Sequence, residues 1–185
     1  MKIEIISGSP RTLSLTRRVA FHLQNLLKQQ TDHEVSLVDM SEINLPPVQS
    51  VFTSVDAAPA EYREITKRVF AADAFVLVTP EYNGSYSPAM KNFLDHFPKQ
   101  NHKVFGIVTA SPGAFGGMRA AMQLQQLIFG LFGVGSPHML VVPMVDKKFT
   151  EEGDLIDRSF EKSVDVFVRE YLWLAEKLVE EKVTV

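Results

Sequence analysis

The sequence predicts an α/β fold: a doubly wound, five-stranded parallel sheet of order 2-1-3-4-5 with helices on both faces. Two observations predict it. Short apolar segments alternate strictly along the chain with segments of helical period. In addition, the third apolar segment has no polar residue in its middle, whereas the second partly alternates with polar residues. Strands joined by helices run parallel with right-handed crossovers, so the helices cover both faces of the sheet.

Five strands are expected, each rich in Val, Ile, Leu or Phe and bounded by turn residues. They are Lys2–Ser7, Glu34–Val38, Ala74–Thr79, Lys103–Thr109 and His138–Pro143. The continuous apolar run of the third strand suits the centre of a sheet, and the alternating second strand suits an edge. The order 2-1-3-4-5 satisfies both conditions.

Helices are expected between the strands. Leu15, Val19, Leu23 and Leu27 are spaced four residues apart and predict the first. The later helical patterns cover Tyr62–Val69, Pro88–Phe97, Met118–Phe132 and Phe160–Leu178. No linker long enough to separate domains is present, so one domain over residues 1–185 is expected. The long connection Asp39–Pro59 is either an ordered surface loop or a mobile flap.

The composition excludes several classes of function. The 185 residues include no cysteine, which removes disulfides and thiolate catalysis, so redox chemistry would have to reside in a bound cofactor. A net charge of −3 gives no sign of a nucleic-acid partner. The five histidines are scattered, and no metal site is assigned. Without a long apolar run or signal peptide, no membrane insertion and a cytoplasmic location are expected.

The topology fixes the expected site before any motif is considered. In a sheet of this order, ligands bind beyond the carboxyl ends of strands 1 and 3. The loops Ser7–Ser14, Thr79–Ser87 and Thr109–Gly117 follow these strands and their neighbour. The sequence therefore predicts one binding site built from the three loops.

The first loop has the composition of an oxyanion site. Gly8-Ser9-Pro10-Arg11-Thr12-Leu13-Ser14-Leu15-Thr16 leads into a helix, whose first N–H groups are unpaired and lie at its positive end. Hydroxyl groups and an arginine add further donors. The loop lacks the spacing of a triphosphate-binding or dinucleotide-binding loop, so a monophosphate fits best. The alternative is that Ser14 only caps the helix and Arg11 is a solvated charge.

The other two loops are rich in turn residues. Thr79-Pro80-Glu81-Tyr82-Asn83-Gly84-Ser85-Tyr86-Ser87-Pro88 can direct backbone N–H groups toward a flat heterocycle, or can be an ordinary turn with a proline in the first helical turn. Ser111-Pro112-Gly113-Ala114-Phe115-Gly116-Gly117 offers glycines that let the backbone approach a ligand closely.

These motifs closely resemble the NADPH-dependent FMN reductase family, which includes quinone, azo-dye and chromate reductases. The resemblance spans residues 1 to about 132, in the expected order and spacing. It implies a flavodoxin-like fold, FMN as cofactor and NADPH or NADH as electron donor. It also implies a homodimer or homotetramer and a small-molecule electron acceptor such as a quinone.

The resemblance further implies the residues that contact FMN. Ser9, Arg11, Ser14 and Thr16, with Leu15 between them, would hold the phosphate, while the second and third loops would contact the ring and the ribityl chain. The residues expected there are Pro80, Glu81, Tyr82, Asn83, Gly84, Ser85, Ser111 and Gly113. Hydride would pass from the nicotinamide to the flavin N5, so no catalytic side chain is assigned.

Two alternative functions use the same loops. A flavodoxin-type electron carrier would bind FMN but have no substrate of its own. Such carriers are typically strongly acidic and dock on their partners by charge, which a net charge of −3 does not suit. A flavin reductase would instead release reduced FMN to a monooxygenase. The sequence does not separate bound from exchanging flavin.

Overall fold

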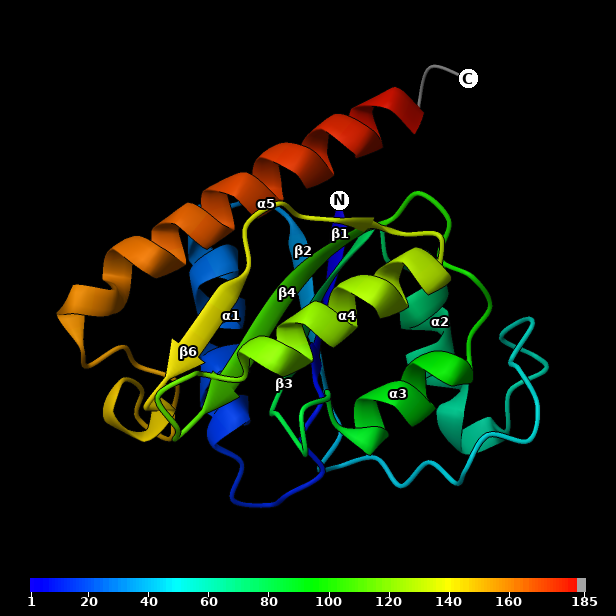
Figure 1. Cartoon of the computed structure of the whole chain (residues 1–185). Helices are drawn as coiled ribbons and strands as arrows, with labels where there is room; N and C mark the ends of the chain where they lie inside the picture. The colour runs from blue at the N-terminus through cyan, green and yellow to red at the C-terminus, as the bar shows by residue number, and fades with distance from the viewer. Residues whose placement is uncertain (183–185) are drawn as a thin grey trace.

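A parallel sheet forms the centre of the computed structural model, which describes residues 1–182 (Figure 1). Its strands β1 (Lys2–Ser7), β2 (Glu34–Asp39), β3 (Ala74–Thr79) and β4 (Val104–Ser111) lie in the order β2-β1-β3-β4. The register pairs Ile3 of β1 with Val35 on one side and Ala74 on the other. Every residue of β3 is buried, and β2 lies at the edge, so both predictions from hydropathy are confirmed.

The fifth position of the sheet differs from the prediction of one strand at His138–Pro143. Two short strands occupy it, β5 (Val134–Gly135) and β6 (Leu140–Pro143), and both pair in parallel with β4. Phe105 pairs with Gly135 and Val108 with Leu140, so the edge contains two more residues than the stretch of β4 that it faces. Pro137 lies in this interruption, where it cannot donate a ladder hydrogen bond. The order 2-1-3-4-5 is nevertheless confirmed.

Helices cover both faces, as predicted. α1 (Leu15–Gln30) and α5 (Glu161–Lys182) pack on one face, and α2 (Arg63–Ala71), α3 (Pro88–Asp95) and α4 (Met118–Gly130) pack on the other (Figure 1). Val19, Leu23 and Leu27 are buried on the inner side of α1. Short 3-10 turns occur at Ala60–Tyr62, Val145–Lys147 and Arg158–Phe160.

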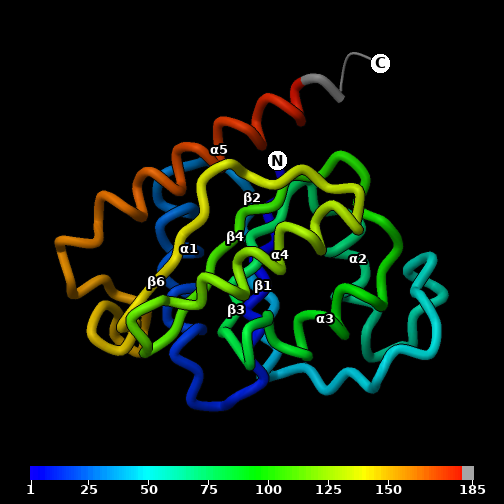
Figure 2. Tube along the Cα trace, viewed as in Figure 1, coloured from blue at the N-terminus to red at the C-terminus, as the bar shows by residue number. Residues whose placement is uncertain are grey.

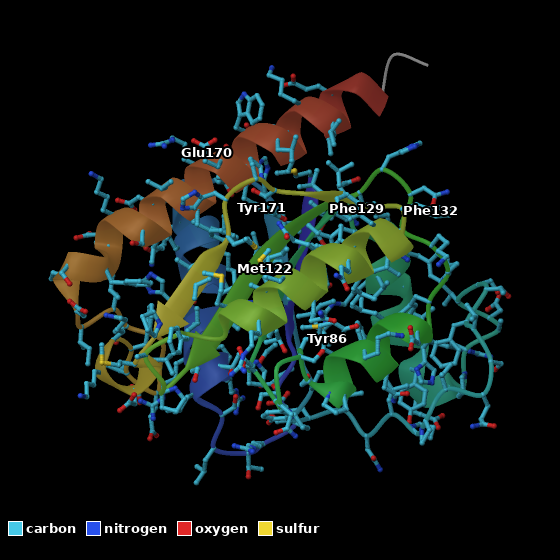
Figure 3. The ribbon with its side chains drawn as sticks, in the orientation of Figure 1. Tyr86, Met122, Phe129, Phe132, Glu170 and Tyr171 are labelled. Carbon is cyan, nitrogen blue, oxygen red and sulfur yellow. The ribbon has the colours of Figure 1, made fainter. Side chains whose placement is uncertain are left out.

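Helix α5 packs closely on β4 because Gly106 has no side chain. A Cβ atom there would lie 2.9 Å from Cζ of Phe167 and 3.0 Å from Cδ2 of Tyr171. Tyr171 points from α5 into this contact and is fully buried (Figure 3). Burial raises the pKa of its phenol well above the usual value. The C-terminal helix is thus part of the core.

The 39–59 connection runs as a loop along α3 (Figure 2). Asn92 of α3 holds it: the amide nitrogen donates to the carbonyl oxygens of Leu45 and Pro46 at 3.2 and 2.9 Å, and the amide oxygen accepts the N–H of Val48 at 3.0 Å. Of the two possibilities for this segment, these contacts favour the ordered surface loop.

No helix within residues 1–182 combines the length and apolar character needed to cross a membrane.

Candidate functional site

The three predicted loops meet at the carboxyl ends of β1, β3 and β4. A hollow of about 110 Å³ lies between them. It is lined by Ser9, Arg11, Leu13, Ser14, Leu15 and Thr16 from the first loop, Pro80 and Tyr82 from the second, and Ala110 and Pro112 from the third. A single hollow therefore lies where the topology predicts a site.

Gly8 fixes the direction in which the chain leaves β1. Its N–H donates to the carbonyl oxygen of Val78 at 2.7 Å, and its own carbonyl accepts the hydroxyl of Ser87. A Cβ atom at Gly8 would lie 3.1 Å from Cβ of Met90 and 3.3 Å from the oxygen of Val78. The first loop is therefore packed against β3 and the start of α3.

Hydrogen-bond donors gather at the start of α1. Ser9, Ser14 and Thr16 are 2%, 8% and 3% exposed, so their hydroxyls lie within the wall of the hollow. The Ser14 hydroxyl accepts the N–H of Arg17 at 3.2 Å, which confirms its role as helix cap. The N–H groups of Leu15 and Thr16 have no partner inside the helix, since they belong to its first turn. Together with the positive end of the helix, these groups have the chemistry to hold an oxyanion.

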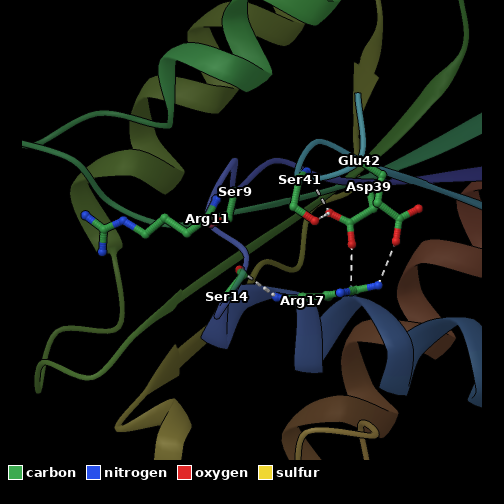
Figure 4. A network of polar contacts seen from close by, with 7 residues as sticks. All are labelled: Ser9, Arg11, Ser14, Arg17, Asp39, Ser41 and Glu42. Atoms are coloured by element: carbon green, nitrogen blue, oxygen red, sulfur yellow. Dashed lines mark hydrogen bonds and ion pairs between the residues drawn. The ribbon is translucent and has the colours of Figure 1, made fainter. Parts of the chain in front are cut away.

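Arg11 differs from the other arginines nearby in having no acidic partner. Arg17 lies 2.7 Å from Asp39 and 2.9 Å from Glu42 (Figure 4), and Arg18 lies 3.2 Å from Glu151. Arg11 forms no ion pair with any residue from 1 to 182. Its side chain points away from the Arg17–Asp39 pair, and its guanidinium carbon lies 4.9 Å from the centre of the Tyr82 ring. Arg11 thus reaches from the first loop to the second with its charge unneutralised.

The second loop is a tight turn. Tyr82 and Ser85 exchange backbone hydrogen bonds of 2.8 and 3.1 Å around Asn83 and Gly84, which have φ of 52° and 86°. These positive angles explain the Asn-Gly pair. Within the described part of the chain, the N–H groups of Glu81, Asn83 and Gly84 have no hydrogen-bond acceptor. The buried hydroxyl of Tyr82 also lacks a partner among residues 1–182.

Ser87 and Tyr86 complete this loop. The Ser87 hydroxyl accepts the N–H of Met90 at 3.1 Å and so caps α3, and its own N–H donates to the hydroxyl of Thr79 at 3.1 Å. Burial raises the pKa of the Tyr86 phenol, an effect that Lys91 opposes. The proline of the first helical turn is present as expected.

The third loop folds back on itself. The Ser111 hydroxyl accepts the N–H of Gly113 at 3.0 Å, and the carbonyl of Gly113 accepts the N–H of Gly116 at 3.2 Å. Gly116 and Gly117 have φ of 60° and 91°, a conformation that favours glycine. Pro112 reaches the hollow, whereas Ser111 and Gly113 do not line it.

Seven of the predicted contact residues line the hollow: Ser9, Arg11, Ser14, Leu15, Thr16, Pro80 and Tyr82. The others, Glu81, Asn83, Gly84, Ser85, Ser111 and Gly113, lie in the adjoining loops but outside its wall. The sequence did not predict that Leu13, Ala110 and Pro112 line the hollow, although all three lie within the predicted loops. It also missed Arg119 of α4, which contacts Glu81 and which no motif had singled out.

The chain is similar to known proteins in sequence and in fold. The profile of a family described as NADPH-dependent FMN reductase matches residues 1–147. An FMN-dependent NADPH-azoreductase of Staphylococcus aureus is 28% identical over 173 residues, which cover 91% of this chain and 92% of that protein.

Among solved structures, FerB, a flavoenzyme NAD(P)H:(acceptor) oxidoreductase from Paracoccus denitrificans, superposes with a TM-score of 0.79 at 24% identity, covering 95% of this chain and 97% of FerB. A flavodoxin mutant from Pseudomonas aeruginosa superposes with a TM-score of 0.57 at 20% identity, covering 92% and 99% of the two chains. These two likenesses establish a flavodoxin-like fold.

Proposed function

The chain belongs to the NADPH-dependent FMN reductase family, and from this premise we propose that the hollow at the carboxyl edge of the sheet binds the phosphate of FMN. The family match confirms the resemblance seen in the sequence, and the protein is an FMN-dependent NAD(P)H oxidoreductase. The residues that hold the cofactor and the acceptor that it reduces belong to the proposal.

One observation carries the assignment of the phosphate: Arg11 has no acidic partner among residues 1–182, whereas Arg17 and Arg18 are both neutralised. A charge of this kind next to buried hydroxyls and a helix N-terminus matches a phosphate, which offers several acceptor oxygens. Ser9, Ser14 and Thr16 would surround the phosphate, and Arg11 would close the site from the solvent side.

The ring of the flavin would lie toward the second loop. Three N–H groups there, of Glu81, Asn83 and Gly84, have no acceptor within residues 1–182 and are free to donate to a ligand. The Tyr82 hydroxyl is buried without a partner in the same part of the chain, and a buried group of this kind is costly unless a ligand or water pairs with it. When bound, FMN accepts hydride from a nicotinamide and passes electrons onward. The chain's part is to hold the ring in place and donate hydrogen bonds to its polar edge.

An absorption spectrum of the purified protein, before and after anaerobic NADPH, tests this function. We expect a flavin spectrum, after reconstitution with FMN if necessary, and prompt bleaching by NADPH. Bound flavin that millimolar NADPH does not bleach would instead indicate an electron carrier of the flavodoxin kind. A colourless protein that reduces added FMN and releases it would indicate flavin delivery to another enzyme.

The chain is further proposed to self-associate into a dimer or tetramer. Large apolar side chains are exposed on α4 and just beyond it: Met118, Met122, Phe129 and Phe132. Figure 3 shows Met122 and Phe129 on this helix and Phe132 just past its end. Exposed apolar side chains that gather along one helix are typical of a surface that associates with another chain. Light scattering should report at least twice the monomer mass of 20.8 kDa. A monomer at micromolar concentration would contradict this expectation.

The electron acceptor is proposed to be a small molecule, either a quinone or an azo compound. The azoreductase relative from S. aureus makes azo dyes the first acceptors to assay. We also propose that the chain acts as one domain and works in the cytoplasm, where a reductant such as NADPH is supplied.

A further inference from the structure

We propose that Glu81 is a positioning residue, which ties the second loop of the site to the start of α4 and thereby fixes the loop that faces the flavin ring. This inference rests on the proposed FMN site and goes beyond it, because the sequence resemblance implied that Glu81 contacts the flavin directly. The Glu81 carboxylate is instead occupied by Arg119: Nε of Arg119 donates to it at 2.9 Å and the Arg119 N–H at 3.2 Å.

Helix α4 needs a partner of this kind at its first turn. The residue before it, Gly117, supplies no side-chain cap. Glycine is required there because φ is 91° and a Cβ atom would lie 2.9 Å from Cβ of Thr109. The same Cβ position is 3.6 Å from Cβ of Glu81. The carboxylate of the second loop therefore caps the helix that follows the third loop, and its negative charge lies at the positive end of that helix.

Glu81 acts on the hollow through its neighbours. Pro80 and Tyr82, on either side of it in the chain, both line the hollow, whereas Glu81 does not. Holding the Glu81 side chain therefore limits the movement of the Tyr82 ring, against which the Arg11 guanidinium lies. One contact thus couples the loops after β3 and β4.

The backbone hydrogen bond should matter more than the ion pair. The Glu81 side chain is 12% exposed, but that of Arg119 is 78% exposed. An ion pair with one exposed partner adds little, because water and salt screen it. The N–H of Arg119 remains when its side chain is removed. Glu81→Ala should therefore disturb the site more than Arg119→Ala does.

The experiment compares Glu81→Ala, Glu81→Gln and Arg119→Ala, with Glu180→Ala as control. Glu180 is an exposed carboxylate paired with Lys177 near the far end of α5. Titrations with FMN and with riboflavin are made well below each melting temperature. Glu81→Ala should weaken the binding of both flavins by about fivefold, which corresponds to the free energy of one helix cap. Glu81→Gln should restore most of this loss, because its amide oxygen still accepts a hydrogen bond, and the other two variants should change affinity less than twofold.

Two further readouts separate positioning from general stability. The reduction potential of bound FMN should shift in Glu81→Ala, whereas a loss of stability alone would leave it unchanged. Without FMN, amide hydrogen exchange should be faster in Glu81→Ala than in the unmodified protein, and it should be faster in residues 80–87 and 117–121 alike. Unchanged flavin affinity and potential in Glu81→Ala, or faster exchange in only one of the two segments, would overturn the inference. If the unmodified protein binds no FMN, the proposed function fails, and the exchange experiment still decides whether Glu81 couples the loops.

Discussion

Replacing Arg11 by alanine should weaken FMN binding by about 10- to 150-fold, because a hydrogen bond to a charged group contributes about 1.5–3 kcal/mol. Riboflavin, which has no phosphate, should bind to the variant and to the unmodified protein equally well. The free energy of unfolding should change by less than about 0.5 kcal/mol, since the side chain is exposed and forms no ion pair within residues 1–182. Fluorescence titration with the two flavins, together with urea unfolding, measures all three quantities.

Arg11→Lys is the matched variant. Lysine keeps the positive charge but lacks the planar guanidinium, which offers two parallel hydrogen bonds and lies over the Tyr82 ring at 4.9 Å. Its FMN affinity should fall between those of the alanine variant and the unmodified protein. Equal losses for FMN and riboflavin would show that Arg11 acts through Tyr82 and not on the phosphate.

The fold and the position of the site could be predicted because both depend on patterns that are local in the sequence. The apolar run Ala74–Val78 and the alternating run Glu34–Val38 locate the centre and the edge of the sheet. Once the strand order is known, the carboxyl ends of β1, β3 and β4 must meet. The hydroxyl-rich first loop then stands out by composition alone.

Side-chain partners could not be predicted, because they depend on distances between loops that are far apart in the sequence. Glu81 and Arg17 are both charged residues in or beside the loops of the site, yet one caps α4 and the other pairs with Asp39. That Arg11, unlike Arg17 and Arg18, has no acidic partner within residues 1–182 emerges only when Asp39, Glu42 and Glu151 are placed in space. The interruption of the edge strand could have been predicted from Pro137, since proline cannot donate a hydrogen bond within a sheet.

At Gly116 a single added methyl group should strongly destabilise the protein. Its φ is 60°, and a Cβ atom would lie 2.7 Å from the backbone nitrogen of Pro143 and 2.7 Å from Cγ1 of Val141. The obstacle is the backbone of β6, which is held in the sheet by its pairing with β4 and cannot move as a flexible side chain would. Gly116→Ala should therefore lower the free energy of unfolding by about 2–4 kcal/mol, from left-handed strain and overpacking together.

Gly113 in the same loop provides the control. A Cβ atom there would meet only the Ser111 hydroxyl, at 3.3 Å, so Gly113→Ala should change the free energy of unfolding by less than about 0.5 kcal/mol. Urea unfolding of the two variants shows whether the loop needs glycine only at Gly116, where the backbone of β6 is close, or at both positions. If both variants unfold at the same urea concentration, β6 must yield to the extra methyl group. The third loop would then be held less firmly than its contacts with β6 imply, and Pro112 would have no fixed place in the wall of the hollow.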